Sequence, residues 1–149
     1  MAAFTSEQIR NVALVAHSGA GKTSIADAMF FVSGGTNRQG RVDDKTSLSD
    51  FEPEEQNRGS SIQATALPCE WKGVKINVLD TPGYADFRGE AISGTRVADG
   101  AVIVVAAPSG VEVGTHQMWK MAAERSLPRV LVVNKMDREN ADFQRVMDS

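Results

Sequence analysis

The sequence of 149 residues has the length of one ordinary domain, with 42% hydrophobic and 23% charged residues. These values exclude a chain that is disordered, collagenous or coiled-coil over its whole length. With 16 basic and 19 acidic residues the net charge is −3, which argues against a general polyanion-coating protein but not against a local nucleic-acid contact.

The sequence also bears on the compartment. Cys69 is the single cysteine, so no internal disulfide can form, which suits a reducing cytosol. No apolar run approaches the roughly 18 residues that span a bilayer, and Met1–Arg10 lacks the pattern of a secretory signal. We expect a cytoplasmic, monomeric protein without membrane contact or sequence-specific DNA binding.

The first elements surround a glycine-rich loop. Asn11–Ala16 is a short apolar run that predicts a buried strand, and it ends directly at the loop. Thr23–Val32 carries apolar residues with the spacing of a largely buried helix. Three glycines within Ser33–Gly40 end that helix.

A long polar stretch, Arg41–Ser61, follows without a clear period. A connection of this length inside a compact domain is either a functional lid or a disordered segment. Its acidic group is interpreted as a solvated face: Asp50, Glu52, Glu54 and Glu55. We expect the stretch to be mobile without a nucleotide, because its order would depend on contacts with phosphate and Mg2+.

The rest of the chain alternates between strands and helices. Ser61–Glu70 and Val74–Leu79 are predicted as strands that pair across a turn. Further elements are predicted at Ala85–Ala98 (helix), Ala101–Ala107 (strand), Val113–Arg125 (helix), Arg129–Val133 (strand) and Phe143–Ser149 (helix). This alternation predicts an α/β fold with a mainly parallel sheet and helices on both faces.

The loop after the first strand has the pattern of a phosphate-binding loop, except that Ala16 replaces the first glycine. Its glycines let backbone N–H groups converge on phosphate oxygens, and the following helix presents its N-terminus to the same anion. Lys22 can reach the β- and γ-phosphates, and the Thr23 hydroxyl can ligate Mg2+. The candidate nucleotide-binding residues are His17, Ser18, Gly19, Ala20, Gly21, Lys22, Thr23 and Ser24.

Two further loops follow predicted strands, at the same edge of the sheet. Asp80 can hold a Mg2+ water, and the N–H of Gly83 can approach a γ-phosphate. In the other loop, the Asp137 carboxylate can accept two hydrogen bonds from guanine, a donor pair that adenine lacks. Lys135 can pack along the base, and Asn134 can brace the loop.

Each loop has a simpler interpretation as a turn or a helix start, and an ATP-binding protein with the same phosphate loop is the rival assignment. The order of the three loops decides against these alternatives, since an ATP site does not need Asn-Lys-x-Asp after the later strand. The sequence therefore predicts a guanine-nucleotide-binding domain.

The chain resembles the N-terminal part of elongation factor G and its close relatives among the translational GTPases. The resemblance runs from about Ile9 to Val146. Its motifs are the phosphate loop, Glu55-x-x-Arg58-Gly59, Asp80-Thr81-Pro82-Gly83-x-x-Asp86-Phe87, Gly110-Val111-Glu112 and Val133-Asn134-Lys135-Met136-Asp137-Arg138. The resemblance implies a P-loop GTPase fold that binds GTP or GDP with Mg2+ and acts on the ribosome.

Three departures from the family pattern bear on the chemistry. The family usually has Ile-Asp where this chain has Ser18-Gly19, and Ile-Thr where it has Ser60-Ser61. Ser61 keeps a hydroxyl for Mg2+, so the candidate metal ligands are Thr23, Ser61 and Asp80. The family's histidine, which positions the attacking water, is replaced by Tyr84. With Gly83, Tyr84 is the candidate catalytic residue, and we expect slow hydrolysis because a phenol cannot supply an imidazole.

The resemblance leaves three roles open. One is a ribosome-dependent GTPase acting in elongation or translocation, and the second is a GTP-sensing switch that hydrolyses poorly. The third is a ribosomal-protection factor. Because the family's domain continues with a further strand and helix, we expect residues 1–149 to be an incomplete GTP-binding domain of a larger factor.

Overall fold

The computed structural model describes residues 4–149. Residues 1–3, which belong to the segment without a secretory signal pattern, lie outside this range. The strands are β1 (Ile9–Ala16), β2 (Thr65–Trp71), β3 (Val74–Asp80), β4 (Gly100–Ala106) and β5 (Arg129–Asn134). The α-helices are α1 (Lys22–Val32), α2 (Pro53–Arg58), α3 (Arg88–Val97), α4 (Val113–Glu124) and α5 (Phe143–Met147), and short 3-10 helices span Ser6–Gln8 and Ala85–Phe87.

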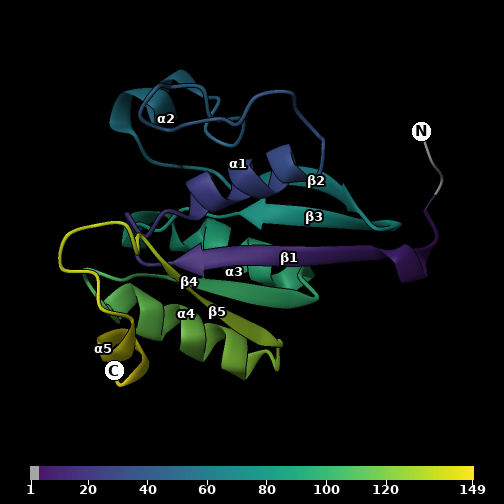
Figure 1. Cartoon of the computed structure of the whole chain (residues 1–149). Helices are drawn as coiled ribbons and strands as arrows, with labels where there is room; N and C mark the ends of the chain where they lie inside the picture. Colours follow the sequence, from purple (N-terminus) through teal and green to yellow (C-terminus); the bar gives the residue numbers. More distant parts are fainter. Residues whose placement is uncertain (1–3) are drawn as a thin grey trace.

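The five strands form one sheet in the order β2-β3-β1-β4-β5. β2 and β3 are an antiparallel pair, whereas β3, β1, β4 and β5 run parallel (Figure 1). The predicted α/β class is therefore confirmed. All four parallel strands end at one edge of the sheet, so the loops after β1, β3 and β5 are brought together there.

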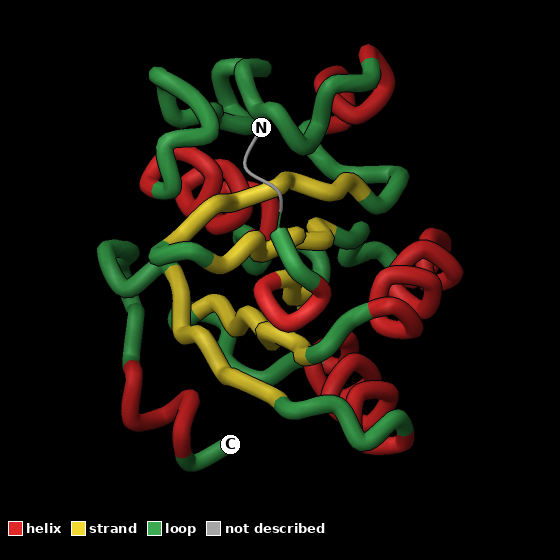
Figure 2. Tube along the Cα trace, turned by 90° about the vertical axis from the view of Figure 1, so that its right-hand side faces the viewer, coloured by secondary structure: helices red, strands yellow, loops and turns green. Residues whose placement is uncertain are grey.

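Helices cover both faces of the sheet, as predicted (Figure 2). Successive side chains of a strand point to opposite faces. Leu14 packs with Ala26 of α1 and Val78 on one face. Ala13 and Val15 pack with residues of α3 and α4 on the other. Because the second half of β1 is buried on both faces, its sequence there is a continuous apolar run without alternation.

The predicted strand from Ser61 to Glu70 begins later than expected. Residues 61–64 are not part of the sheet, and carboxylates instead accept hydrogen bonds from the backbone N–H groups of residues 62–64. Glu55 Oε1 accepts hydrogen bonds from Ile62 N at 2.8 Å and Gln63 N at 3.1 Å. Glu90 Oε2 accepts one from Ala64 N at 3.0 Å. The ladder with β3 starts only at Thr65.

The connection between α1 and β2 is not without regular structure. It carries α2 and lies above α1 in Figure 1. Pro53 occupies the first turn of α2, and the Glu55 side chain accepts a hydrogen bond from Glu52 N at 3.3 Å, which closes a capping box. The sequence prediction missed this helix because six residues are too few to show a helical period.

The other predicted helices hold with small changes. The helix predicted at Ala85–Ala98 begins with a 3-10 turn at Ala85–Phe87, and the one predicted at Phe143–Ser149 ends at Met147. Within residues 4–149, no helix combines the length and the apolar character needed to cross a membrane.

The core on the α1 face gives a stability test. Leu14 is completely buried, and Leu14→Ala removes its contacts and leaves a cavity. We expect the free energy of unfolding in urea to fall by about 3 kcal/mol. The control Val32→Ala, at a side chain that is 65% exposed, should change it by less than about 0.5 kcal/mol. A loss below about 1 kcal/mol for Leu14→Ala would contradict this packing.

Candidate functional site

A polar pocket of about 270 Å3 lies at the carboxyl ends of the parallel strands. The phosphate loop, the α1–β2 connection, the loop after β3 and the loop after β5 all contribute to its wall. Eleven lining residues were predicted as site residues or identified as departures from the family pattern: Ser18, Gly19, Gly21, Lys22, Thr23, Ser24, Ser60, Ser61, Gly83, Tyr84 and Lys135. The topology thus brings three separate sequence motifs to one place.

Backbone geometry explains the glycine positions of the phosphate loop. Gly21 caps α1 with φ of +95°, a left-handed conformation that side chains with a Cβ rarely adopt. A Cβ at Gly21 would also collide with the side-chain amide of Asn134. At Gly83, a Cβ would lie 2.5 Å from Lys22 Nζ and 2.8 Å from Ser18 Cα. The loops after β1, β3 and β5 therefore approach one another as closely as glycine permits.

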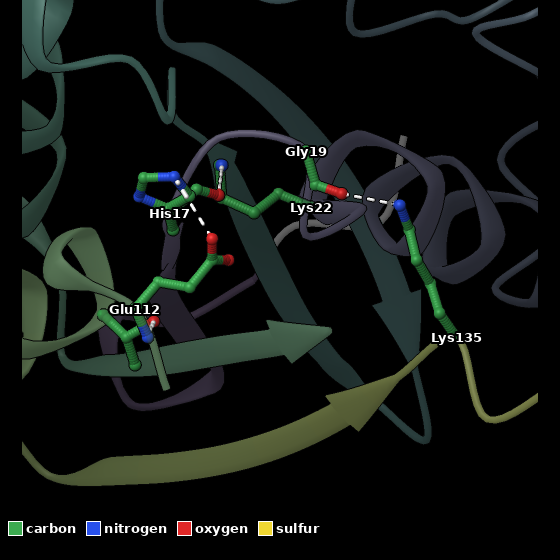
Figure 3. A network of polar contacts seen from close by, with 6 residues as sticks. His17, Gly19, Lys22, Glu112 and Lys135 are labelled. Carbon is green, nitrogen blue, oxygen red and sulfur yellow. Dashed lines mark hydrogen bonds and ion pairs between the residues drawn. The ribbon is translucent and has the colours of Figure 1, made fainter. Parts of the chain in front are cut away.

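The loop after β5 is tied to the phosphate loop by two side chains. Asn134 Nδ2 donates to Ala20 O at 2.9 Å, and Lys135 Nζ donates to Gly19 O at 2.7 Å. Figure 3 shows the lysine side chain extended toward Gly19. Lys135 has φ of +59°, a strained conformation for a residue with a side chain, and such strain is typical of functional sites. The Asn134 contact is the kind of bracing that the sequence analysis expects of this residue.

Lys22 lies among carboxylates at the bottom of the pocket. It is 6% exposed, and its Nζ donates to His17 O at 3.5 Å. Burial lowers the pKa of Lys22, an effect that Asp80 and Asp50 oppose. Its hydrogen bond within residues 4–149 is thus a long one to a carbonyl, so this amine can turn to bind phosphate oxygens.

Asp80 is 1% exposed and Asp50 is 2% exposed. Ser49 Oγ donates to Asp80 Oδ2 at 2.6 Å, and Ser61 Oγ donates to Asp50 Oδ1 at 2.6 Å. Among residues 4–149, the other oxygen of each carboxylate is buried without a hydrogen-bond partner. Burial raises the pKa of Asp80 to about 6 and also raises the pKa of Asp50. Two buried carboxylates with free oxygens indicate a place for a cation.

The predicted metal ligands belong to this network. Thr23 Oγ1 and Ser61 Oγ lie 3.0 Å apart, close to Asp50 and Asp80 through the bonds above. Hydroxyl and carboxylate oxygens are the ligands that Mg2+ prefers. Within residues 4–149 no cluster of three or more His, Cys, Asp or Glu side chains could hold a metal alone. An ion here would therefore share its ligands with a phosphate group, as Mg2+ does in nucleotide sites.

The sequence analysis misjudged two acidic residues. Asp50 and Glu55 are buried, so the interpretation of the acidic group as a solvated face is wrong for them. It holds for Glu52 and Glu54, which are exposed. Arg138 also lines the pocket and was not predicted as a site residue. Asp50 and Glu55 are buried through tertiary contacts, because Ser61 donates to Asp50 and the N–H groups of residues 62 and 63 donate to Glu55.

Five predicted nucleotide-binding residues do not line this pocket: His17, Ala20, Asp80, Asn134 and Asp137. Asp80 belongs to the network of buried carboxylates, and Asn134 bonds to Ala20 of the phosphate loop. The His17 imidazole points to Glu112 at the start of α4, with Nε2 3.5 Å from Oε1 (Figure 3). Only its carbonyl faces Lys22. Asp137 has a side chain that is 82% exposed and lies 3.8 Å from Arg138 Nε. Its carboxylate is therefore exposed to solvent.

The buried carboxylate gives a pH-dependent prediction. Because the folded state raises the pKa of Asp80 to about 6, it binds a proton more tightly than the unfolded state, and stability falls as pH rises from about 4 to above 6. Asp80→Asn removes this penalty. We expect the nucleotide-free variant to be more stable than wild type by about 2–3 kcal/mol at pH 8, and similar to wild type at pH 4.

Urea unfolding at both pH values, without Mg2+, measures this effect. The control Asp86→Asn makes the same change in charge at an exposed residue and should show no such pH dependence. An Asp80→Asn variant that is equally destabilised at both pH values would contradict a penalty from ionisation.

Comparison with known proteins agrees with the prediction of a guanine-nucleotide-binding domain. A family model described as the elongation factor Tu GTP binding domain matches residues 7–149. The mitochondrial ribosome-releasing factor 2 of Candida albicans is 46% identical over 138 residues, which cover 93% of this chain and 17% of the relative. Elongation factor G 2 of Streptomyces coelicolor is 42% identical over 141 residues, which cover 95% and 21%. The chain thus spans about a fifth of the length of these relatives.

Solved structures agree with the sequence relatives. A crystal structure of a protein from Thermus thermophilus matches with a TM-score of 0.90 and 37% identity, over 95% of this chain and 21% of that one. Translation elongation factor SelB from Methanococcus maripaludis, in complex with a GTP analogue, matches with a TM-score of 0.69 and 19% identity, over 93% and 24%, which shows likeness of fold. The resemblance found in the sequence is confirmed, and the chain belongs to the family of elongation factor Tu GTP-binding domains.

Proposed function

We propose that this chain binds GTP and GDP with Mg2+ in the pocket at the carboxyl edge of the sheet, and that it hydrolyses GTP slowly. The observation that carries the proposal is that the loops after β1, β3 and β5 contact one another at one edge of the sheet. Lys22 lies at the bottom of the pocket, and Asn134 and Lys135 bond directly to Ala20 and Gly19 of the phosphate loop. The phosphates and the base of one nucleotide would therefore contact two loops that are hydrogen-bonded to each other.

The residues present have the chemistry that a magnesium nucleotide requires. Thr23 and Ser61 supply hydroxyl oxygens, and Asp80 and Asp50 supply carboxylate oxygens that have no partner among residues 4–149. When bound, Mg2+ would neutralise charge on the phosphates. The chain's own part is to hold the phosphates with Lys22 and loop N–H groups, and to keep the carboxylates buried near them.

The relatives' names supply the proposed setting. One is an elongation factor and the other a ribosome-releasing factor. We therefore propose that the protein works on the ribosome during elongation or translocation, in the cytoplasm. The mitochondrial relatives make an organelle the alternative location.

Tyr84 favours a second candidate, a GTP-dependent switch that hardly hydrolyses. Its side chain is 46% exposed and lines the pocket beside Gly83. A phenol can donate a hydrogen bond to water, but an ordinary phenol, with a pKa near 10, is a poor base at neutral pH. Binding would then persist while the chemical step slows, as expected of a switch.

Base recognition is tested by titration calorimetry with GTP, GDP and ATP, each with Mg2+. We expect micromolar or tighter binding of both guanine nucleotides and no measurable binding of ATP. Asp137→Asn should weaken GTP binding by at least about 100-fold, because an amide donates where guanine also donates. The same variant should gain affinity for xanthosine triphosphate, which carries an acceptor at that position.

The matched control is Asp142→Asn, at the cap of α5, which should bind GTP like wild type. Equal binding of GTP and ATP by wild type would refute guanine recognition by this loop. Binding of GTP that survives Asp137→Asn would place recognition of the base elsewhere.

The role of Tyr84 is tested by Tyr84→His. An imidazole can position water at neutral pH, so we expect the single-turnover rate of GTP hydrolysis to rise at least about tenfold, with an unchanged affinity for GDP. The control Tyr84→Phe, which has neither hydroxyl nor imidazole, should show no gain. Fast hydrolysis by wild type, or a histidine variant as slow as the phenylalanine variant, would contradict the assigned role.

A further inference from the structure

The three departures from the elongation factor G pattern meet in one pocket. Ser18 comes from the phosphate loop, Ser60 from the α1–β2 connection and Tyr84 from the loop after β3. Two of these positions carry isoleucine in the family pattern, so a hydroxyl replaces an apolar side chain at each. Far apart in the sequence, these two substitutions add hydroxyls to the pocket, and the third exchanges an imidazole for a phenol.

The pocket's hydroxyl groups fall into two sets. Those of Thr23 and Ser61 belong to the network around Asp50. The hydroxyls of Ser18, Ser60 and Tyr84 make no hydrogen bond to any residue among 4–149. Since all three residues line a polar pocket, their donors are available to water or to a bound ligand.

The residues that carry these unbonded hydroxyls are in or next to the segments that hold Lys22, Gly83 and Ser61 in the pocket. The Ser18 backbone and the Lys22 amine both lie within contact distance of the position that a Cβ on Gly83 would occupy. Tyr84 follows Gly83, and Ser60 precedes the Ser61 that contacts Thr23. Lys22 is the pocket's group for the terminal phosphates. Ser18, Ser60 and Tyr84 line the same pocket as Lys22, so their hydroxyls would meet a ligand near the γ-phosphate.

We propose that Ser18 and Ser60 are positioning residues that, together with Tyr84, hold the attacking water by hydrogen bonds. This inference rests on the proposed function, because it concerns the slow hydrolysis of GTP in the same pocket. The water oxygen forms a bond to the γ-phosphorus, and the bond from that phosphorus to the β–γ bridging oxygen breaks. GDP and inorganic phosphate leave, with the protons of the water on the phosphate products and solvent.

The proposal gives the size and the pattern of the expected effects. A hydrogen bond between neutral groups corresponds to about a fivefold change in rate when it acts in the transition state. Three hydroxyls that hold the same water should not act independently. Removing two of these hydroxyls should therefore slow hydrolysis by a factor that differs from the product of the two single-variant factors.

The experiment measures single-turnover GTP hydrolysis at saturating Mg2+ and protein, alongside the Kd for GDP and for GTP. The variants are Ser18→Ala, Ser60→Ala, Tyr84→Phe and the paired combinations. A second series compares Ser60→Thr with Ser60→Val, which match in size but differ in the hydroxyl. Ser93→Ala is the control, because its hydroxyl lies on α3 and bonds to Gly89 O at 3.0 Å.

We expect each of the three single variants to hydrolyse GTP about 3–10 times more slowly, with both Kd values unchanged within about twofold. Ser60→Thr should keep the wild-type rate, whereas Ser60→Val should be as slow as Ser60→Ala. Ser93→Ala should match wild type. A structural role alone would change the Kd values and would not separate threonine from valine.

The possible outcomes distinguish a failure of this inference from a failure of the proposed function. Absence of GTP binding by wild type overturns both. Tight GTP binding and slow hydrolysis that Ser18→Ala and Ser60→Ala leave unchanged would overturn the inference alone. A faster rate in Ser60→Val than in Ser60→Thr would also overturn it, since the apolar side chain would then favour the reaction.

Discussion

The pocket holds more buried carboxyl groups than buried amines, and the rest of the site depends on this imbalance of charge. The amine of Lys22 lies near the carboxylates of Asp50 and Asp80, and all three side chains are almost completely shielded from water. One positive charge cannot neutralise these two negative charges, and the buried carboxyl groups of Asp27 and Glu55 lie near Asp50 as well. The folded state therefore either keeps a proton or gains a cation there. Without a bound cation the excess negative charge at this place stays uncompensated, so we expect cation binding to favour order in the segments that carry these carboxylates.

The same constraint explains how the α1–β2 connection is held. Its anchors are polar: Asp27 Oδ1 accepts a hydrogen bond from Leu48 N at 3.0 Å, Ser49 bonds to Asp80, and Ser61 bonds to Asp50. Leu48 and Phe51, two large apolar side chains of the connection, are exposed. A segment fixed mainly by hydrogen bonds to ionisable groups opens at lower cost than one fixed by a core. The expectation that it is mobile without nucleotide therefore stays a prediction with a physical basis.

The sequence predicted those parts of the molecule that depend on local pattern. β1 and β4 are apolar runs, and the phosphate loop and the Asn-Lys-x-Asp loop are short motifs whose geometry is mostly their own. What it could not predict arises between distant segments. Glu55 moves the start of β2 to Thr65 by accepting N–H bonds from residues 62 and 63. Asp50 enters the site only because the fold brings it to Ser61 and α1. In sequence, each is one acidic residue in a polar stretch.

The tight contact between Gly21 and Asn134 limits which substitutions the protein can accept at these two positions. The residue before α1 and the last residue of β5 share one volume, and only the absence of a side chain at Gly21 lets the Asn134 amide occupy it. The two positions cannot vary independently over evolutionary time. A larger residue at 21 would displace Asn134 and with it the loop after β5, so the geometry of that loop would change without any replacement within it.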